Sequence, residues 1–163
     1  MIFVTVGTQL PFERLIVTVD AWAADHPDAP VYAQIGPGCK LTPTHVEHAE
    51  FVSPDRADQL FRQARVIVSH AGMGSILTAL KYRKPIIIMP RRADLGEHRN
   101  DHQWATAEYL GKSPGVSVAW SEHELVAALN RYQSMQGGTG ISEYASPELI
   151  AYLKTFIGSE TEL

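Results

Sequence analysis

The sequence has little of several features that mark particular classes of protein. It contains one cysteine, Cys39, among 163 residues. It therefore cannot form an internal disulfide bond, which fits a reducing cytoplasm. Its net charge of -4 leaves no basic excess to neutralise a nucleic-acid backbone. The longest apolar runs, such as residues 85–90, are far shorter than the ~20 residues that cross a bilayer.

Other signals are also missing. No basic segment precedes the first apolar run, so we expect no signal peptide and a cytoplasmic protein. Any contact with a membrane then has to come through a partner or a surface helix. The dinucleotide fingerprint G-x-G-x-x-G, the phosphate-loop sequence Gly-Lys-Ser/Thr and the zinc motif His-Glu-x-x-His are all absent.

What is present is a regular alternation of apolar strands and amphipathic helices. β-branched runs between turn residues predict buried strands, and apolar spacing of three and four predicts helices. The expected strands cover residues 2–6, 31–35, 49–52, 66–68, 85–89 and 116–119. The expected helices cover residues 11–22, 54–64, 75–82, 100–110, 121–131 and 147–157, and a flexible loop is expected at 136–140.

Strands that are apolar throughout predict a parallel sheet with both faces covered. The fold class is therefore α/β, a Rossmann-like doubly wound sheet, and we expect residues 1–163 to form a single domain. In such a sheet the ligand lies at the carboxyl ends of the strands, near the point where the strand order reverses. The loops to consider are residues 7–9, 36–39, 69–75 and 90–103.

The glycine turn at residues 70–75 has the chemistry of a phosphate cradle. His70, Ala71, Gly72, Met73, Gly74 and Ser75 follow a strand and open a helix. Glycines let the backbone approach a ligand, and the free N–H groups with the helix dipole attract a diphosphate. The alternative is a tight turn that needs its glycines only for packing, with Ser75 as a helix cap. Gly7 and Thr8, after the first strand, form a second small loop that suits either phosphate contact or a plain turn.

The loop at residues 91–103 holds an unusual number of functional groups. His98 and His102 are four apart, which would place them on one helix face and suggests a metal site with Asp94 or Glu97. The histidines stand at a predicted helix start, however, and the zinc motif is missing. Asp101 and Gln103 are suited to hydrogen bonds with sugar hydroxyls, while the simpler alternative is helix capping by Asn100 and Asp101 beside a solvated charge run.

At this point the sequence resembles a known family. The segments at residues 6–8, 69–75, 84–85, 89–91 and 98–103 resemble, in order and spacing, the C-terminal donor-binding half of GT-B glycosyltransferases of family 28. The likeness is greater to the separately encoded subunits that hold only that half, in dolichol-linked oligosaccharide and bacterial exopolysaccharide synthesis. It extends from the first strand to about Leu110.

The resemblance implies a UDP-sugar site in a single GT-B half-domain, with no cofactor and no metal. The implied diphosphate ligands are Gly7, Thr8, His70, Ala71, Gly72, Met73, Gly74 and Ser75. The implied sugar and ribose ligands are Thr78, Arg91, Arg92, His98, Asp101, His102 and Gln103. Uracil is expected against the loop after the second strand or the Ser53 region.

Two positions depart from the family's pattern. Many relatives carry an acidic residue, which binds both ribose hydroxyls, where this sequence has Thr78. A threonine binds one hydroxyl, which puts ribose recognition by this residue in doubt. Arg83 stands where glycine is common.

The resemblance also implies a missing half. GT-B enzymes act in a cleft between two domains, and 163 residues hold only one. We therefore expect a membrane-anchored partner that binds a lipid-linked saccharide acceptor and supplies the catalytic base. The helix at residues 147–157 is a candidate for docking that partner, or else it packs on its own sheet. The chain would then lie peripherally at the inner face of the cell membrane.

The implied activity is transfer of a hexose or uronic acid in an inverting reaction, active only with the partner. Arg91 or Arg92 could pair with a sugar carboxylate and favour a UDP-uronic acid. The alternative is a non-catalytic nucleotide-sugar-binding module with a regulatory or scaffolding role, which the threonine at position 78 favours.

Overall fold

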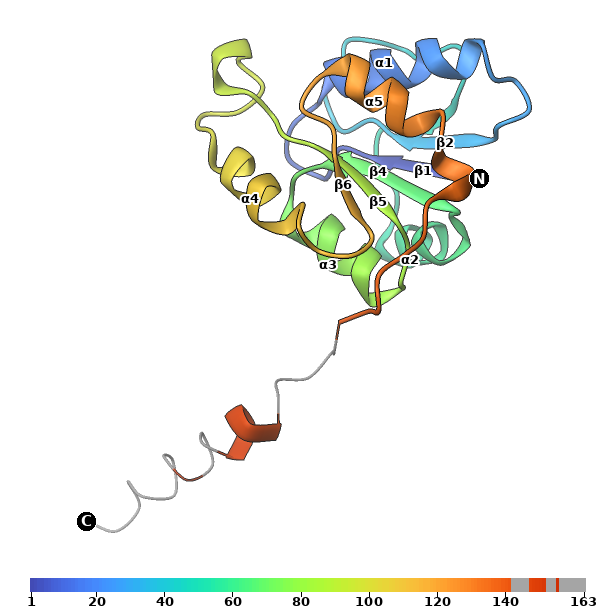
Figure 1. Ribbon diagram of the computed structural model, residues 1–163. Helices are drawn as coiled ribbons and strands as arrows, with labels where there is room; N and C mark the ends of the chain where they lie inside the picture. The colour runs from blue at the N-terminus through green and yellow to red at the C-terminus, as the bar shows by residue number, and fades with distance from the viewer. Residues whose placement is uncertain (142–146, 152–154, 156–163) are drawn as a thin grey trace.

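The computed structural model describes residues 1–141, 147–151 and 155. Six strands form one parallel sheet in the order β3-β2-β1-β4-β5-β6 (Figure 1). The strands are β1 Ile2–Thr5, β2 Val31–Gln34, β3 Glu47–Ala49, β4 Val66–His70, β5 Ile86–Met89 and β6 Val116–Val118. The helices are α1 Glu13–Ala24, α2 Pro54–Gln63, α3 Met73–Lys81, α4 His102–Leu110 and α5 Glu122–Leu129, with short 3₁₀ turns η1 Ala93–Leu95 and η2 Tyr132–Ser134.

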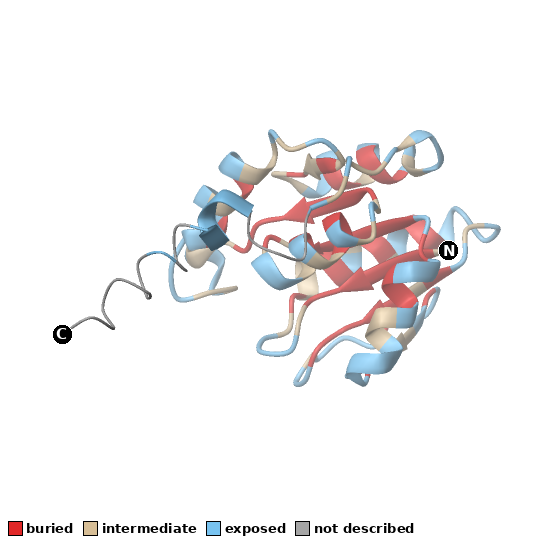
Figure 2. Cartoon of the chain, turned by 90° about the horizontal axis from the view of Figure 1, so that it is seen from below, coloured by how far each residue is buried: buried red, intermediate tan, exposed pale blue. Residues whose placement is uncertain are grey.

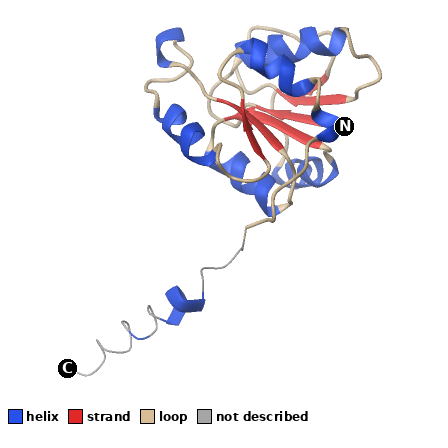
Figure 3. Cartoon of the chain, viewed as in Figure 1, coloured by secondary structure: helices blue, strands red, loops and turns tan. Residues whose placement is uncertain are grey.

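Helices cover both faces of the sheet (Figures 1 and 3). On one face α1 and α5 pack against side chains such as Val4, Val68 and Ile87. On the other face α2, α3 and α4 pack against Phe3, Ile67 and Ile88. The four central strands, β2, β1, β4 and β5, are buried on both sides, as Figure 2 shows, because their residues are apolar at nearly every position. The predicted doubly wound α/β fold is confirmed.

Local sequence signals account for the helix starts at α2 and α5. Ser53 caps α2 by accepting a hydrogen bond from the Arg56 N–H at 3.3 Å, with Pro54 in the first turn. Ser121 caps α5 by accepting from the Glu124 N–H at 3.2 Å. The Glu124 carboxylate accepts from the N–H of Trp120, one residue before the cap, at 2.9 Å. The capping-box sequence therefore fixes this end of α5 as predicted, with the return bond shifted by one residue.

Several boundaries differ from the prediction, and three of the differences have a clear local reason. The third strand is Glu47–Ala49, not residues 49–52, because an edge strand pairs by backbone hydrogen bonds alone and does not need an apolar run. Helix α3 starts two residues early, at Met73, because Gly72 is extended and serves as the cap. Helix α4 starts at His102, since Asp101 is its cap position.

The glycine-rich segment 136–141 is not the flexible loop that the sequence predicted. It is packed tightly against the turns that precede β5 and β6, and we call it the glycine strap. A Cβ on Gly137 would lie 1.7 Å from the Arg83 carbonyl oxygen, and one on Gly138 would lie 2.2 Å from that of Pro114. Arg83 itself has φ 53° and is the one non-glycine residue with positive φ in the described part of the chain. A glycine, which the resemblance led us to expect at this position, would adopt this backbone conformation without strain.

The predicted C-terminal helix lies only partly within the described residues. Residues 147–151 and 155 are helical, and the side chains of Leu149 and Ile150 are 49% and 37% exposed. The predicted apolar positions Leu153, Phe156 and Ile157 fall outside the described residues. Within the described ranges, no helix combines the length and the apolar character needed to span a bilayer.

Candidate functional site

A pocket of about 500 Å³ opens at the carboxyl ends of β1 and β4. These two strands lie side by side at the centre of the sheet, and the chain leaves them toward opposite edges. The loops after them therefore diverge and leave a crevice between them. The lining residues are Thr5, Val6, Gly7, Thr8, Gln9, Leu10, Gln34, Phe61, His70, Gly72, Met73, Gly74, Ser75, Thr78, Arg91, His98, His102 and Gln103.

The structure brings most of the predicted ligand residues together in this pocket. Twelve of them line it: Gly7, Thr8, His70, Gly72, Met73, Gly74, Ser75, Thr78, Arg91, His98, His102 and Gln103. Ala71 does not line it, because its side chain is buried in the core. Arg92 and Asp101 line a second cavity on the other side of the first turn of α4.

A row of buried polar side chains that the sequence analysis missed crosses the sheet beside the pocket, and two of them, Thr5 and Gln34, line it. Thr5, Gln34 and Ser69 are register partners on β1, β2 and β4, and all three are buried. The Thr5 hydroxyl donates to the Gln34 side-chain oxygen at 2.7 Å and accepts from the Gly7 N–H at 3.2 Å. The signal was available, since each of these apolar strands carries one polar residue at or near its carboxyl end.

Gly7 and Gly72 make room for the imidazole of His70. A Cβ on Gly72 would lie 2.2 Å from His70 Nε2, and one on Gly7 would lie 2.8 Å from Cε1. Gly7 also has φ +79°, which favours glycine. These two glycines therefore position the histidine. Gly74 is different, because a Cβ there would meet no atom within 4 Å. Its missing side chain leaves open space in the pocket.

His70 is neutral at physiological pH. The pKa of His70 is lowered from 6.5 to about 4, mainly by burial and then by the nearby positive charge of Arg91, although a hydrogen bond with the Thr5 backbone acts the other way. A neutral imidazole can donate one hydrogen bond without a fixed positive charge. A bound diphosphate would raise the pKa of His70, because an anion favours the protonated ring.

The low pKa of His70 predicts a loss of stability in mild acid. The folded protein resists protonation of this ring down to about pH 4, whereas the unfolded chain takes up the proton near pH 6.5. The stabilising contribution is therefore complete above pH 6.5 and is lost as the pH falls toward 4, by about 3 kcal/mol in total. We expect urea unfolding to show that the free energy of unfolding falls less steeply between pH 6.5 and pH 4 in His70→Asn than in the wild type. Equal pH dependence in the two proteins would contradict the lowered pKa of His70.

Helix α3 directs its N-terminus into the pocket. It has no side-chain cap, so the first N–H groups, on Met73, Gly74 and Ser75, are not used by a capping side chain. Ser75 is thus not the cap of this helix. Thr78, one turn further on, donates its hydroxyl hydrogen to the Gly74 carbonyl at 2.7 Å. Its oxygen can still accept one hydrogen bond from a ligand hydroxyl, consistent with a single ribose contact.

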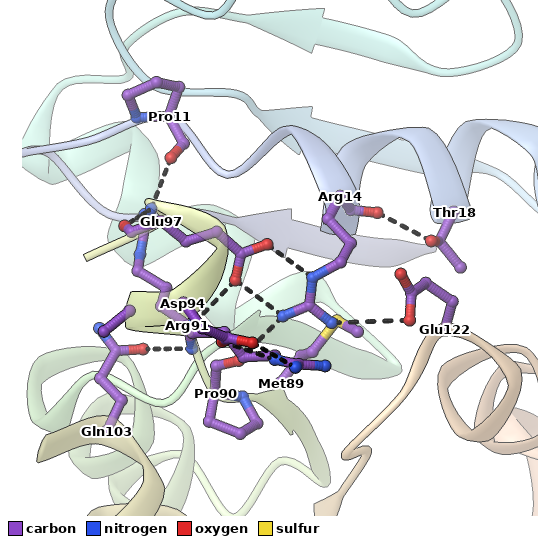
Figure 4. A network of polar contacts seen from close by, with 12 residues as sticks. Pro11, Arg14, Thr18, Met89, Pro90, Arg91, Asp94, Glu97, Gln103 and Glu122 are labelled. Carbon is purple, nitrogen blue, oxygen red and sulfur yellow. Dashed lines mark hydrogen bonds and ion pairs between the residues drawn. The ribbon is translucent and has the colours of Figure 1, made fainter. Parts of the chain in front are cut away.

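Arg91 holds the loops around the pocket together (Figure 4). Its side chain is buried, and its guanidinium donates to the carbonyl oxygens of Val6 at 2.9 Å and Leu10 at 2.7 Å. It also donates to those of Pro11 and Glu97. The prediction that Arg91 reads a sugar carboxylate does not fit this geometry, because backbone carbonyls occupy the guanidinium. Arg91 shapes the loop after β1.

The second arginine in this network lies on α1. Arg14 forms a two-pronged ion pair with Glu97, at 2.6 and 2.8 Å, and also donates to the Pro90 carbonyl (Figure 4). Glu97 also accepts from the Arg92 N–H at 2.8 Å. The carboxylate considered as a metal ligand is therefore engaged in holding the loop. Within the described residues, no group of three histidine, cysteine or acidic side chains is placed to hold a metal.

His98 and His102 lie together in the lining of the pocket. Their ring centroids are 4.6 Å apart and the rings are nearly perpendicular. Gln103, beside them, is buried, and its side-chain oxygen accepts from the Arg91 N–H at 3.1 Å. The start of α4 and the loop before it thus present imidazole and amide groups to the pocket.

Comparison with known proteins agrees with this architecture. Residues 1–136 match the description "Glycosyltransferase family 28 C-terminal domain". Over 75 residues the chain is 36% identical to the UDP-N-acetylglucosamine transferase subunit ALG13 of Eremothecium gossypii, covering 40% of this chain and 36% of that subunit.

Solved structures share the fold. A solution structure of ALG13 superposes with a TM-score of 0.60 at 20% identity, covering 93% of this chain and 94% of that one. The kitacinnamycin glycotransferase superposes with a TM-score of 0.62 at 24% identity, covering 82% of this chain. The chain spans about a third of that enzyme's length, since 34% of it is covered.

Proposed function

Because the chain belongs to the glycosyltransferase family 28 C-terminal domain family, we propose that its pocket binds the UDP-sugar donor of a glycosyltransferase. The observation that carries this proposal is the uncapped N-terminus of α3, which opens beside neutral His70 onto the pocket at the switch point. The helix dipole and free N–H groups suit a diphosphate.

The same groups suit catalysis of the transfer. As the sugar–phosphate bond breaks, negative charge grows on the leaving diphosphate. N–H donors already aimed at that position stabilise the transition state more than the ground state. The one N–H of neutral His70 donates to the Thr5 backbone, so the ring can donate to the diphosphate only when the bound anion favours its doubly protonated form. It is a poor general base, since its pKa is about 4.

The acceptor and the base are proposed to come from a second subunit. This chain then forms one half of a two-component inverting enzyme, as the word "subunit" in the name of the ALG13 relative supports. The partner is membrane-anchored and presents a lipid-linked saccharide, and exopolysaccharide synthesis is the proposed setting. The exposed apolar residues Leu149 and Ile150 are candidate contacts for that partner.

We propose that the sugar transferred from the UDP-sugar donor is uncharged. Of the two arginines first considered for a uronic acid, Arg91 is saturated by backbone carbonyls and Arg92 pairs with Asp94 outside the pocket. His98, His102 and Gln103 remain at the sugar end, and they suit hydroxyl or acetamido groups. We therefore favour a UDP-hexose or UDP-N-acetylhexosamine over a UDP-uronic acid.

Calorimetric titration tests this proposal. UDP, UDP-glucose, UDP-N-acetylglucosamine and UDP-glucuronic acid are titrated into the wild type, Gly74→Ala and His70→Asn. The added methyl of Gly74→Ala projects into open pocket space, so we expect about tenfold weaker UDP binding with an intact fold. His70→Asn should also weaken binding.

Unchanged UDP affinity in both variants would place the nucleotide elsewhere. Absence of nucleotide binding to the wild type would overturn the proposal. Tightest binding of UDP-glucuronic acid would contradict the preference for a neutral sugar.

A further inference from the structure

The outer face of α4 forms a second cavity, of about 540 Å³. Asp101, Trp104, Ala105 and Glu108 follow the spacing that puts residues on one side of a helix, and the small Ala105 leaves the middle hollow. Arg92 and Asp94, from the loop after β5, complete the lining. The buried residues of α4, Gln103 and Ala107, are outside this set.

The aromatic part of this cavity is exposed yet held in place. Trp104 is 39% exposed and contacts Trp120, with ring centroids 4.5 Å apart and planes tilted by 42°. Trp120 is partly buried against the core, and its backbone N–H donates to the Glu124 carboxylate. Trp104 therefore offers a fixed apolar surface to the solvent.

The polar part is also preorganised. The Arg92 guanidinium binds both carboxylate oxygens of Asp94, at 3.0 and 2.6 Å. Asp101 accepts from the Ala93 N–H at 3.0 Å, which fixes that carboxylate. Three carboxylates against one guanidinium give the cavity a net negative charge, which repels phosphates and uronic acids. Carboxylates accept hydrogen bonds from hydroxyl groups well.

We infer that this cavity binds a neutral saccharide, with a sugar ring lying on Trp104 and its hydroxyls donating to the carboxylates. The inference rests on the proposed function, since the saccharide is that of the acceptor. The position supports it: Asp101 in this cavity and His102 in the donor pocket are consecutive residues at the start of α4. The two cavities therefore flank the first turn of α4.

The three tryptophans give a direct readout. The indole N–H signals of Trp22, Trp104 and Trp120 are followed by ¹H–¹⁵N NMR in the whole chain. Neutral tetrasaccharides of glucose, N-acetylglucosamine, mannose and galactose are added in turn, with tetragalacturonate as the acidic comparison. Trp22, whose indole donates to Asn130 elsewhere in the fold, is the internal reference.

We expect at least one neutral saccharide to shift Trp104 and Trp120 but not Trp22, and tetragalacturonate to shift none. Trp104→Ala should weaken binding about tenfold or more. Tyr109→Ala, which removes a 77% exposed aromatic ring of α4 that does not line the cavity, should leave binding unchanged.

A separate UDP titration, followed at the amides of residues 70–75, separates the two claims. Saccharides that leave Trp104 unmoved while UDP binds overturn this inference alone. A saccharide response without any UDP response overturns the proposed function, and with it the assignment of the saccharide as the acceptor, and leaves only a saccharide-binding cavity. Equal effects of Trp104→Ala and Tyr109→Ala also overturn the inference.

Discussion

Arg91→Met is expected to lower the free energy of unfolding by about 3 kcal/mol or more and to abolish UDP binding. The guanidinium serves the carbonyls of Val6, Leu10 and Pro11, which lie in the loop after β1, as well as that of Glu97. Without the guanidinium, these carbonyl oxygens lose their hydrogen-bond donor in a buried region that little water reaches. The loop that carries Gly7 and Thr8 then loses its anchor.

The neighbouring arginine provides a matched control. Arg92 lies partly exposed and pairs with Asp94, so Arg92→Met should change stability by less than about 1 kcal/mol. Arg91→Lys should not restore stability or UDP binding, because an ammonium group cannot donate to four carbonyl oxygens at once as the planar guanidinium does. Urea unfolding and UDP calorimetry on the three variants check this. Equal stability of Arg91→Met and Arg92→Met would show that Arg91 is not an anchor.

Gly137→Ala is expected to be the most damaging glycine substitution at a position whose backbone angles suit alanine. Its Cβ would lie 1.7 Å from the Arg83 carbonyl oxygen and 2.4 Å from the carbonyl carbon. Both are backbone atoms next to β5, so the strap itself has to move. We expect a loss of about 3 kcal/mol in the free energy of unfolding.

Gly74→Ala serves as the counterpart for this measurement. Its Cβ meets nothing within 4 Å, and Gly74 is in a helix, where alanine is favoured by up to ~1 kcal/mol. Thermal and urea unfolding should therefore rank Gly74→Ala at or above the wild type and Gly137→Ala far below it. A Gly137→Ala protein as stable as the wild type would mean that the strap is not packed as described.

The main features of the fold and pocket follow from patterns that are local in the sequence. Apolar strands separated by amphipathic helices specify a parallel sheet, and its topology places the loops after β1 and β4 together. These patterns predict that the glycine turn at residues 70–75 and the loop at residues 90–103 lie at the carboxyl ends of the strands, and the resemblance to GT-B enzymes implies that they share one site. The location of the loops needs only a few neighbouring residues and a general rule for parallel sheets, whereas the ligand roles come from the resemblance.

What the sequence did not reveal depends on contacts between distant segments. Arg91 looked like a ligand because nothing in its surroundings shows that it reaches carbonyls 80 or more residues away, such as Pro11. The strap looked flexible because glycine-rich segments are commonly loops, whereas here Gly137 and Gly138 fit close backbone crossings. The third strand was misplaced because an edge strand carries little apolar signal.

The close fit between His70 and Gly72 has an evolutionary consequence. If the histidine were replaced by a small residue, position 72 could then accept a side chain, because its backbone is extended and the three atoms nearest to a Cβ there all belong to the imidazole. Once a side chain had settled there, the ring could not return without a clash. A side chain can thus replace Gly72 once His70 has been lost, but His70 cannot be restored while that side chain is present. A lineage that loses the histidine would tend to stay without it.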